Sequence, residues 1–188
     1  MRPESERTTS AAGSNRVLLA YFSRAGENYY YGDRRTLEVG NTAVLASMIA
    51  DRVDCDVFEI KAADPYPSDY EATVARNVRE EQQDARPEID GDLPSLDAYD
   101  TVLLGSPVWN VQTSMIMRTF VEVLDLGGKT IHPFVTYAVS QMGSVRSDYR
   151  RLVPDATVTE GLAVQGETVN DGASDVAAWL DTLDLPRK

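Results

Sequence analysis

A regular alternation of short apolar runs with amphipathic segments constrains the fold of this chain more than any other feature. Apolar runs that predict buried strands cover Val17–Phe22 and residues 57–60, 101–105, 131–139 and 158–164. Each run is followed by a segment whose apolar residues recur at helical spacing. Five strands alternating with five helices predict an α/β domain in which a parallel sheet is covered on both faces.

The helices are predicted from their apolar stripes and from capping residues. Asn41 or Thr42 is a plausible N-cap for the first helix, and Ser68 or Asp69 for the second. The stripes are Val44, Leu45, Met48, Ile49 and Val53; then Tyr70, Val74 and Val78; Ile116, Phe120, Val123 and Leu124; Val145, Tyr149 and Leu152; and Val176, Trp179, Leu180 and Leu183.

Composition excludes several classes of function. The 188 residues carry a formal net charge of −12, which argues against a nucleic-acid partner, because phosphate contacts need clustered Lys and Arg. Such charge suits docking onto a basic protein, or it simply keeps the chain in solution; both readings stay open. The single cysteine, Cys55, rules out an internal disulfide, and with one histidine in the chain we expect no metal site.

The first fifteen residues are polar and small, and they contain no apolar run of the length that a signal peptide needs. We therefore expect residues 1–15 to be a disordered leader and residues 16–188 to form one domain. No stretch of about 18 apolar residues occurs, so we expect no membrane span and a cytoplasmic protein.

Ligands of such sheets bind beyond the carboxyl ends of the strands, where the strand order reverses. This rule directs attention to the loop after the first strand. Ser23, Arg24, Gly40, Asn41 and Thr42 offer hydroxyls, an amide, a guanidinium and a helix N-terminus, the chemistry that holds a phosphate. The alternative is that Asn41 and Thr42 only cap the helix.

Two further loops could hold a flat ring. The loop after residue 105 contains Ser106, Pro107, Val108, Trp109 and Asn110, and a tryptophan at the end of a central strand is well placed to stack on an aromatic ligand. The alternative is a tryptophan that closes the loop over the sheet. In the third loop, Tyr137 offers a second aromatic face, followed by Gln141, Met142 and Gly143.

These segments resemble the flavodoxin family over residues 16–183. YFSRAG and GNTAVLA are similar to its phosphate-binding loop, GSPVWN to the loop whose tryptophan packs on the flavin, and FVTYAVSQMGS to the segment on the ring's other edge. PYPSDYEATVARNVREEQQDARPEI and EGLAVQG resemble an insertion-bearing branch of the family. The resemblance implies a doubly wound five-stranded parallel sheet of order 2-1-3-4-5 and noncovalent binding of flavin mononucleotide (FMN).

The chain departs from the family pattern at two loops. Tyr137, Ala138, Val139 and Gln141 stand where many relatives have glycines and a histidine, and Asn110 with Val111 replaces a second aromatic residue or a glycine. An insertion, residues 27–39, interrupts the phosphate loop and contains three tyrosines and two arginines. It is either a flap over the cofactor, with an arginine adding charge at the phosphate, or a surface excursion. His132, at the start of a strand, is interpreted as structural.

Three functions fit these observations. The first is an FMN-binding redox protein that passes electrons to or from a partner protein or a small-molecule acceptor. The second is a flavin-dependent NAD(P)H:quinone-type reductase, and the third a flavodoxin-like scaffold that has lost flavin. The sequence singles out no catalytic residue and leaves monomer and homodimer open.

Overall fold

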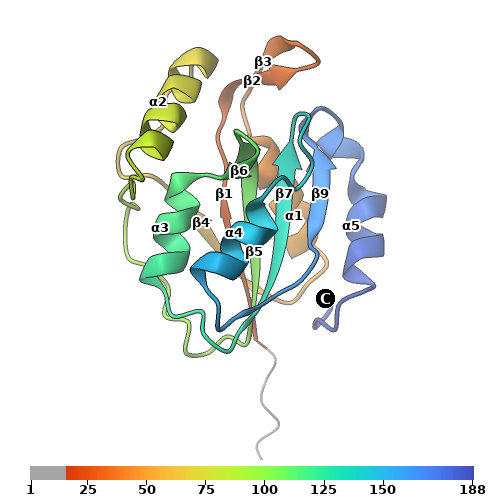
Figure 1. The fold of residues 1–188 in the computed structure, drawn as a ribbon. Helices are drawn as coiled ribbons and strands as arrows, with labels where there is room; N and C mark the ends of the chain where they lie inside the picture. The colour runs from red at the N-terminus through yellow and green to blue at the C-terminus, as the bar shows by residue number, and fades with distance from the viewer. Residues whose placement is uncertain (1–15) are drawn as a thin grey trace, which may run out of the picture.

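The computed structural model describes residues 16–188, so the predicted leader, residues 1–15, lies outside the described part (Figure 1). Its centre is a parallel sheet in the order β4-β1-β5-β7-β8, with β9 also pairing in parallel with β7. The strands are β1 (Val17–Phe22), β4 (Asp56–Ile60), β5 (Thr101–Trp109), β7 (Thr130–Tyr137), β8 (Thr157–Val158) and β9 (Leu162–Gln165). Counting β8 and β9 as one position, this confirms the predicted order 2-1-3-4-5.

Helices cover both faces of the sheet, as predicted (Figure 1). α1 (Asn41–Ala50) and α5 (Ala173–Leu180) pack on one face, and α3 (Met115–Val123) and α4 (Val145–Leu152) on the other. The alternating side chains of β1 explain the two cores, because Val17 and Leu19 join the α1–α5 core while Leu18, Ala20 and Phe22 join the other.

Three predicted strand boundaries are wrong. β5 continues past residue 105 to Trp109, because it forms a hairpin with β6 (Gln112–Thr113). β7 stops at Tyr137 rather than at residue 139. The run 158–164 is split into β8 and β9 at Gly161, whose φ of +81° is outside the extended region.

α2 (Tyr70–Gln82) begins where predicted, since Asp69 is its N-cap and accepts a hydrogen bond from the backbone N–H of Ala72 at 2.7 Å. Its apolar stripe, however, is not its buried face. Thr73, Asn77 and Glu80 are buried, while Val74 and Val78 are 40% and 37% exposed. Figure 1 shows α2 standing above α3 at the upper edge of the molecule rather than over the sheet, so its stripe does not reach either core.

The insertion forms a hairpin of its own, β2 (Gly26–Tyr30) paired antiparallel with β3 (Asp33–Leu37). The two turn residues, Tyr31 and Gly32, have φ values of 48° and 89°, which are typical of a two-residue hairpin turn. Neither core contains a residue of this hairpin. Among residues 16–188, no helix has both the length and the apolar character to cross a membrane.

Candidate functional site

A pocket opens at the carboxyl ends of β1, β5 and β7, where the sequence predicts a ligand site. It is open to solvent, and the space between its walls, counted together with the open solvent at its mouth, is about 570 Å³. Its lining residues are Ser23, Arg24, Asn28, Tyr29, Asn41, Thr42, Tyr70, Pro107, Val108, Trp109, Thr136, Tyr137, Ala138, Gly166 and Glu167. The pocket thus brings together eight of the predicted site residues: Ser23, Arg24, Asn41, Thr42, Pro107, Val108, Trp109 and Tyr137.

The N-terminus of α1 forms one end of the pocket, but neither Asn41 nor Thr42 caps it. Gly40 is the N-cap, and Ser23 at the end of β1 serves the helix instead, its Oγ accepting from the N–H of Ala43 at 3.0 Å. A Cβ on Gly40 would lie 2.3 Å from that Oγ, so a glycine is needed there. The Ser23 hydroxyl keeps its proton available for a ligand. The N–H of Ala43 is used by Ser23, while the N–H groups of Asn41 and Thr42, which precede it, have no intrahelical acceptor.

Thr42 and Asn41 have different surroundings. The Thr42 hydroxyl is buried and lies 2.7 Å from that of Thr136, which joins α1 to β7. Asn41 is half-buried and packs closely on Gly166, where a Cβ would stand 2.4 Å from the Asn41 Nδ2. Gly166 opens a 3₁₀ turn, η1 (Gly166–Asp171), and its lack of a side chain lets this turn form a wall of the pocket.

Arg24 lines the pocket, and its guanidinium is held by backbone carbonyls. Its Nη1 donates to the carbonyls of Pro67 at 2.9 Å and Ser68 at 3.3 Å, and its Nη2 donates to the carbonyl of Glu27. Burial among these groups lowers the pKa of its guanidinium, although nearby Tyr70 and Glu27 act in the opposite direction. Arg24 therefore fastens the start of the β2–β3 hairpin to the segment before α2, rather than presenting its charge to a phosphate.

Trp109 forms another wall of the pocket. It is half-buried, and its ring meets Phe22 and Tyr66 in edge-to-face contacts with centroid distances of 5.5 Å and 5.1 Å. Tyr66 is itself held, because its hydroxyl donates to Glu80 at 2.8 Å and the Arg76 guanidinium lies over its ring. Trp109 therefore both closes the end of the sheet and presents surface to the pocket.

The remaining predicted site residues lie outside the pocket. Ser106 is fully buried, and Gly40 lies behind Ser23. Asn110 is at the tip of the β5–β6 turn, where its Nδ2 donates to Glu81 at 2.7 Å. Gln141, Met142 and Gly143 follow β7 but do not line the pocket. A Cβ on Gly143 would meet the Val111 carbonyl at 2.2 Å, so this glycine supports the turn.

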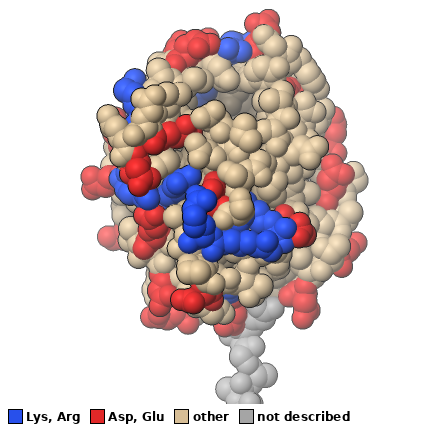
Figure 2. All heavy atoms as spheres, in the orientation of Figure 1, with Lys and Arg blue, Asp and Glu red and all other residues tan. Residues whose placement is uncertain are grey.

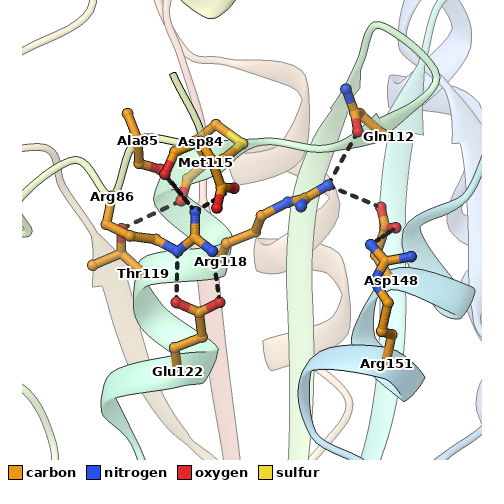
Figure 3. A network of polar contacts seen from close by, with 10 residues as sticks. All are labelled: Asp84, Ala85, Arg86, Gln112, Met115, Arg118, Thr119, Glu122, Asp148 and Arg151. Carbon is orange, nitrogen blue, oxygen red and sulfur yellow. Dashed lines mark hydrogen bonds and ion pairs between the residues drawn. The ribbon is translucent and has the colours of Figure 1, made fainter. Parts of the chain in front are cut away.

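A buried carboxylate holds the β5–β6 hairpin in place (Figure 3). Asp148 of α4 accepts hydrogen bonds from the Thr113 N–H at 3.1 Å, the Ser144 hydroxyl at 3.0 Å and Arg151 at 2.8 Å. Arg118 of α3 lies 3.8 Å from the same carboxylate and donates to Gln112 at 3.0 Å. One side chain thus joins β6, α3 and α4 beneath the strand that ends at Trp109.

The β2–β3 hairpin forms a wall of the pocket and is tied down on two sides. Asn28 and Tyr29 line the pocket. Arg34 reaches α2, where it pairs with Glu71 at 2.8 Å and lies over the ring of Tyr70. On the opposite side, Glu167 accepts from the N–H of Tyr31 at 3.3 Å. The hairpin is thus part of the site, and not a surface excursion away from it.

Seven pocket residues are not predicted from the sequence: Asn28, Tyr29, Tyr70, Thr136, Ala138, Gly166 and Glu167. Thr136, Ala138 and Gly166 lie in segments that resemble the family's loops, so this resemblance could have predicted them as site residues. Asn28, Tyr29 and Tyr70 enter only because the hairpin and α2 fold back toward the sheet.

The fold and the place of the pocket define the class of protein. The chain leaves β1 for β4 at one edge and returns to β5 on the other side of β1, so the pocket lies where the strand order reverses. This is the ligand-binding arrangement of the doubly wound, flavodoxin-like α/β proteins. The chain belongs to the flavodoxin family, whose model matches residues 16–183.

Solved structures agree with this assignment. A protein from Bacteroides uniformis that is provisionally named a flavoprotein shares 27% identity, with a TM-score of 0.70 and coverage of 89% of this chain and 98% of that one. A similarly named protein from Bacteroides eggerthii shares 27% identity, with a TM-score of 0.71 and coverage of 92% and 99%. A flavoprotein from Lactobacillus acidophilus, solved in complex with FMN, has the same fold at 20% identity, with a TM-score of 0.60 and coverage of 86% and 99%. No curated protein matches the chain.

Proposed function

We propose that the pocket binds FMN noncovalently and that the protein passes electrons to or from a partner. The observation that carries the proposal is the presence, in one pocket, of an open helix N-terminus and of the aromatic residues Trp109 and Tyr137. FMN has the same two parts, a phosphate and a flat ring. The FMN complex of the Lactobacillus acidophilus flavoprotein, which shares the fold, supports this choice of ligand.

The residues at the α1 end fit a phosphate. The Ser23 hydroxyl and the first N–H groups of α1 can donate to its oxygens, and the helix dipole favours the negative charge. Arg35 is the better candidate for added positive charge than Arg24, which donates to backbone carbonyls, or Arg34, which pairs with Glu71, because Arg35 instead lies over the ring of Tyr30, 5.1 Å from its guanidinium carbon. It lines a hollow that adjoins the pocket and shares Asn28, Asn41 and Glu167 with it.

The aromatic and apolar residues of the pocket fit the isoalloxazine ring. Trp109 and Tyr137 offer aromatic surface, while Pro107 and Val108 supply apolar contact along the end of β5. When bound, FMN supplies the electron-carrying chemistry, and the chain orients the ring and excludes water from its inner edge. Two of the four residues that depart from the family pattern in the third loop lie away from the pocket, because Val139 is 79% exposed and Gln141 does not line it, whereas Tyr137 and Ala138 do line it.

The partner of an electron carrier would meet a surface of mixed charge. Figure 2 shows Lys and Arg side chains gathered in a band across the middle of one face, over α3 and α4, although the whole chain is acidic. Arg118, Arg146 and Arg151 of these helices are paired with Asp148 or Glu160. At long range the net charge of −12 of the whole chain favours a basic partner protein.

The first experiment is a titration of the purified protein with FMN, followed by its absorption and by tryptophan fluorescence. We expect one FMN per chain and quenching that comes from Trp109, since Trp179 is buried in the α1–α5 core. Trp109→Ala should weaken FMN affinity by about 1–3 kcal/mol and remove most of the quenching. Protein that binds no FMN at high micromolar concentration would contradict the proposal, and unchanged affinity in the variant would reassign Trp109 to a structural role.

A reductase is the second candidate function, favoured by open apolar space beside Trp109 that Tyr70, Val74 and Val78 border. FMN-loaded protein would then oxidise NADH or NADPH in the presence of a quinone. A protein that only carries electrons would show no such turnover until a partner protein was added.

A further inference from the structure

Three aromatic side chains connect the pocket proposed to bind FMN with a neighbouring cleft. Trp109 lines the pocket, and Phe22 and Tyr66 line the cleft, which lies beside the carboxyl ends of β1 and β4. The centroids of the Tyr66 and Trp109 rings are 5.1 Å apart, and each ring also contacts that of Phe22 at 5.5 Å. Phe22 is buried, whereas Tyr66 and Trp109 are half-buried. Two oxidisable side chains are therefore in direct contact, one facing the pocket and one facing the cleft.

The Tyr66 hydroxyl has a base at its proton. It donates to the Glu80 Oε2 at 2.8 Å, and the Glu80 side chain is only 11% exposed. The other oxygen of Glu80 accepts a hydrogen bond from Arg76 at 2.8 Å. Burial, together with the contact with Glu80, raises the pKa of the Tyr66 hydroxyl well above its ordinary value. Tyr66 is thus a neutral phenol whose proton already points at a carboxylate.

The charges around the Tyr66 ring decide how it can be oxidised. The Arg76 guanidinium lies over the ring at 4.0 Å, and Asp64 pairs with this guanidinium at 3.3 Å. Loss of an electron alone would leave a positive ring beneath a cation in a half-buried place, which is costly. Transfer of the phenolic proton to Glu80 in the same step leaves the ring neutral. The geometry therefore favours the loss of an electron and a proton together.

We propose that Tyr66 donates an electron to an oxidised Trp109 and that Glu80 accepts the proton. One electron passes from the Tyr66 phenol to the Trp109 indole radical cation, while the phenolic proton passes to the Glu80 Oε2. The products are a neutral indole, a neutral tyrosyl radical and a protonated carboxyl group, so electrons, protons and charge balance. This relay moves an oxidising equivalent from the pocket to the cleft that Tyr66 lines, where a small-molecule reductant can reach it.

The oxidant of Trp109 would be a light-excited flavin in the pocket. That source of the oxidising equivalent rests on the proposed function, whereas the transfer between Tyr66 and Trp109 does not. The transfer can therefore be tested on the chain without any cofactor.

Pulse radiolysis of the full chain is the direct test. Azidyl radicals oxidise tryptophan in preference to tyrosine, and Trp179→Phe leaves Trp109 as the only tryptophan. An indole radical that has lost its proton to water regains one when it is reduced. Tyr66→Phe removes the phenol and keeps the ring. Tyr99→Phe is the matched control, because the Tyr99 hydroxyl also donates to a carboxylate, Asp56 at 2.7 Å, but lies before the opposite end of β5.

We expect the absorption of the Trp109 radical to decay as that of a tyrosyl radical rises, at a rate independent of protein concentration. Tyr66→Phe should slow this decay about tenfold or more, and Tyr99→Phe should leave it unchanged. Glu80→Gln keeps an oxygen for the hydroxyl but is a far weaker base, so it should slow the decay by a similar factor. The decay should also be slower in heavy water, a measurement that needs no substitution at Glu80.

Decay that is as fast in Tyr66→Phe as without it, equal effects of the two phenylalanines, or the same rate in water and heavy water would overturn the relay. A second measurement separates it from the proposed function: FMN-loaded protein is illuminated, and the tyrosyl radical is sought by electron paramagnetic resonance. A chain that binds no FMN contradicts the proposed function and leaves the radiolysis result standing. A chain that binds FMN but shows no transfer from Tyr66 in radiolysis contradicts the relay alone.

Discussion

Single residues shape the pocket beside the N-terminus of α1. Gly166 has no side chain, so η1 can approach Asn41, and Ser23 supplies the capping oxygen that Gly40 cannot. Glu167 should repel a bound phosphate, because it places a carboxylate in the wall of the pocket proposed to hold FMN. Its contact with the Tyr31 N–H explains its presence, since that bond ties down the hairpin.

The Glu167 carboxylate gives a prediction at this scale. Glu167→Gln keeps an oxygen for the Tyr31 N–H but removes the negative charge, so FMN should bind about two- to fivefold more tightly at low salt. Riboflavin, which has no phosphate, should bind the variant and the parent protein equally. The measurement is a pair of fluorescence titrations; equal gains for FMN and riboflavin would show that repulsion of the phosphate is not the cause.

At the scale of elements, the pocket depends on parts that add little to the two cores. The β5–β6 hairpin is strained at its turn, where Asn110 and Val111 have φ values of 48° and 64°, the second unusual for a β-branched residue. Contacts on both sides hold this turn, since Glu81 binds Asn110 and the Ser144 N–H donates to the Val111 carbonyl at 2.8 Å. Neighbouring elements therefore position the strand end that carries Trp109.

Removing the buried carboxylate beneath this hairpin should be costly. Asp148→Ala leaves the Thr113 N–H without its acceptor and the Arg118 guanidinium without its ion-pair partner, and we expect a loss of about 3–5 kcal/mol in the free energy of unfolding. Arg151→Ala, which removes a partner whose side chain is 63% exposed, should cost less than about 1 kcal/mol. Urea unfolding of both variants checks this, and equal losses would contradict a central role for Asp148.

Shortening the β2–β3 hairpin tests its part in ligand binding. Replacing residues 29–34 with Asn-Gly keeps the Asn28 and Arg35 pair in register and makes a favourable two-residue turn. The unfolding midpoint should change little, because no core residue is removed. FMN affinity should fall about fivefold with the loss of the Tyr29 wall. Unchanged affinity and an unchanged rate of FMN release would show that the hairpin does not retain the cofactor.

At the scale of the whole molecule, the single histidine makes stability depend on pH in a simple way. His132 is 7% exposed in β7, and its Nδ1 lies 2.9 Å from the Thr159 hydroxyl. Burial lowers the pKa of its imidazole below the ordinary value of 6.5. The unfolded chain therefore takes up a proton at this residue at higher pH than the folded chain does.

The free energy of unfolding should thus be greatest above about pH 6.5 and fall as the pH drops from there through the folded pKa, by at most about 1.4 kcal/mol per pH unit. His132→Gln should flatten this slope between about pH 6.5 and pH 5, since no other histidine is present. Urea unfolding at a series of pH values measures the effect. A slope that the substitution leaves unchanged would assign it to other groups.

The sequence by itself determined the alternation of strands and helices, the two covered faces and the edge at which the pocket lies, while the sheet order came from the resemblance to the flavodoxin family. Apolar periodicity reports which side chains must leave water, and strands buried on both faces carry that signal strongly, as in Val17–Phe22. The sequence also placed Ser23, Asn41, Trp109 and Tyr137 at the pocket, because they lie at or beyond the carboxyl ends of strands whose ends meet.

Only the tertiary structure decided what the longer and more polar side chains do. Arg24 donates to the carbonyls before α2, Asn110 donates to Glu81, and Val74 and Val78 of the α2 stripe are exposed. None of these contacts could be predicted, because each depends on residues distant in the sequence. The hairpin wall could not be foreseen for the same reason, since its strands are half-buried or exposed and carry no strong apolar pattern. The local pattern of apolar residues predicts which side chains are buried, whereas the partners of polar side chains depend on how the elements pack together.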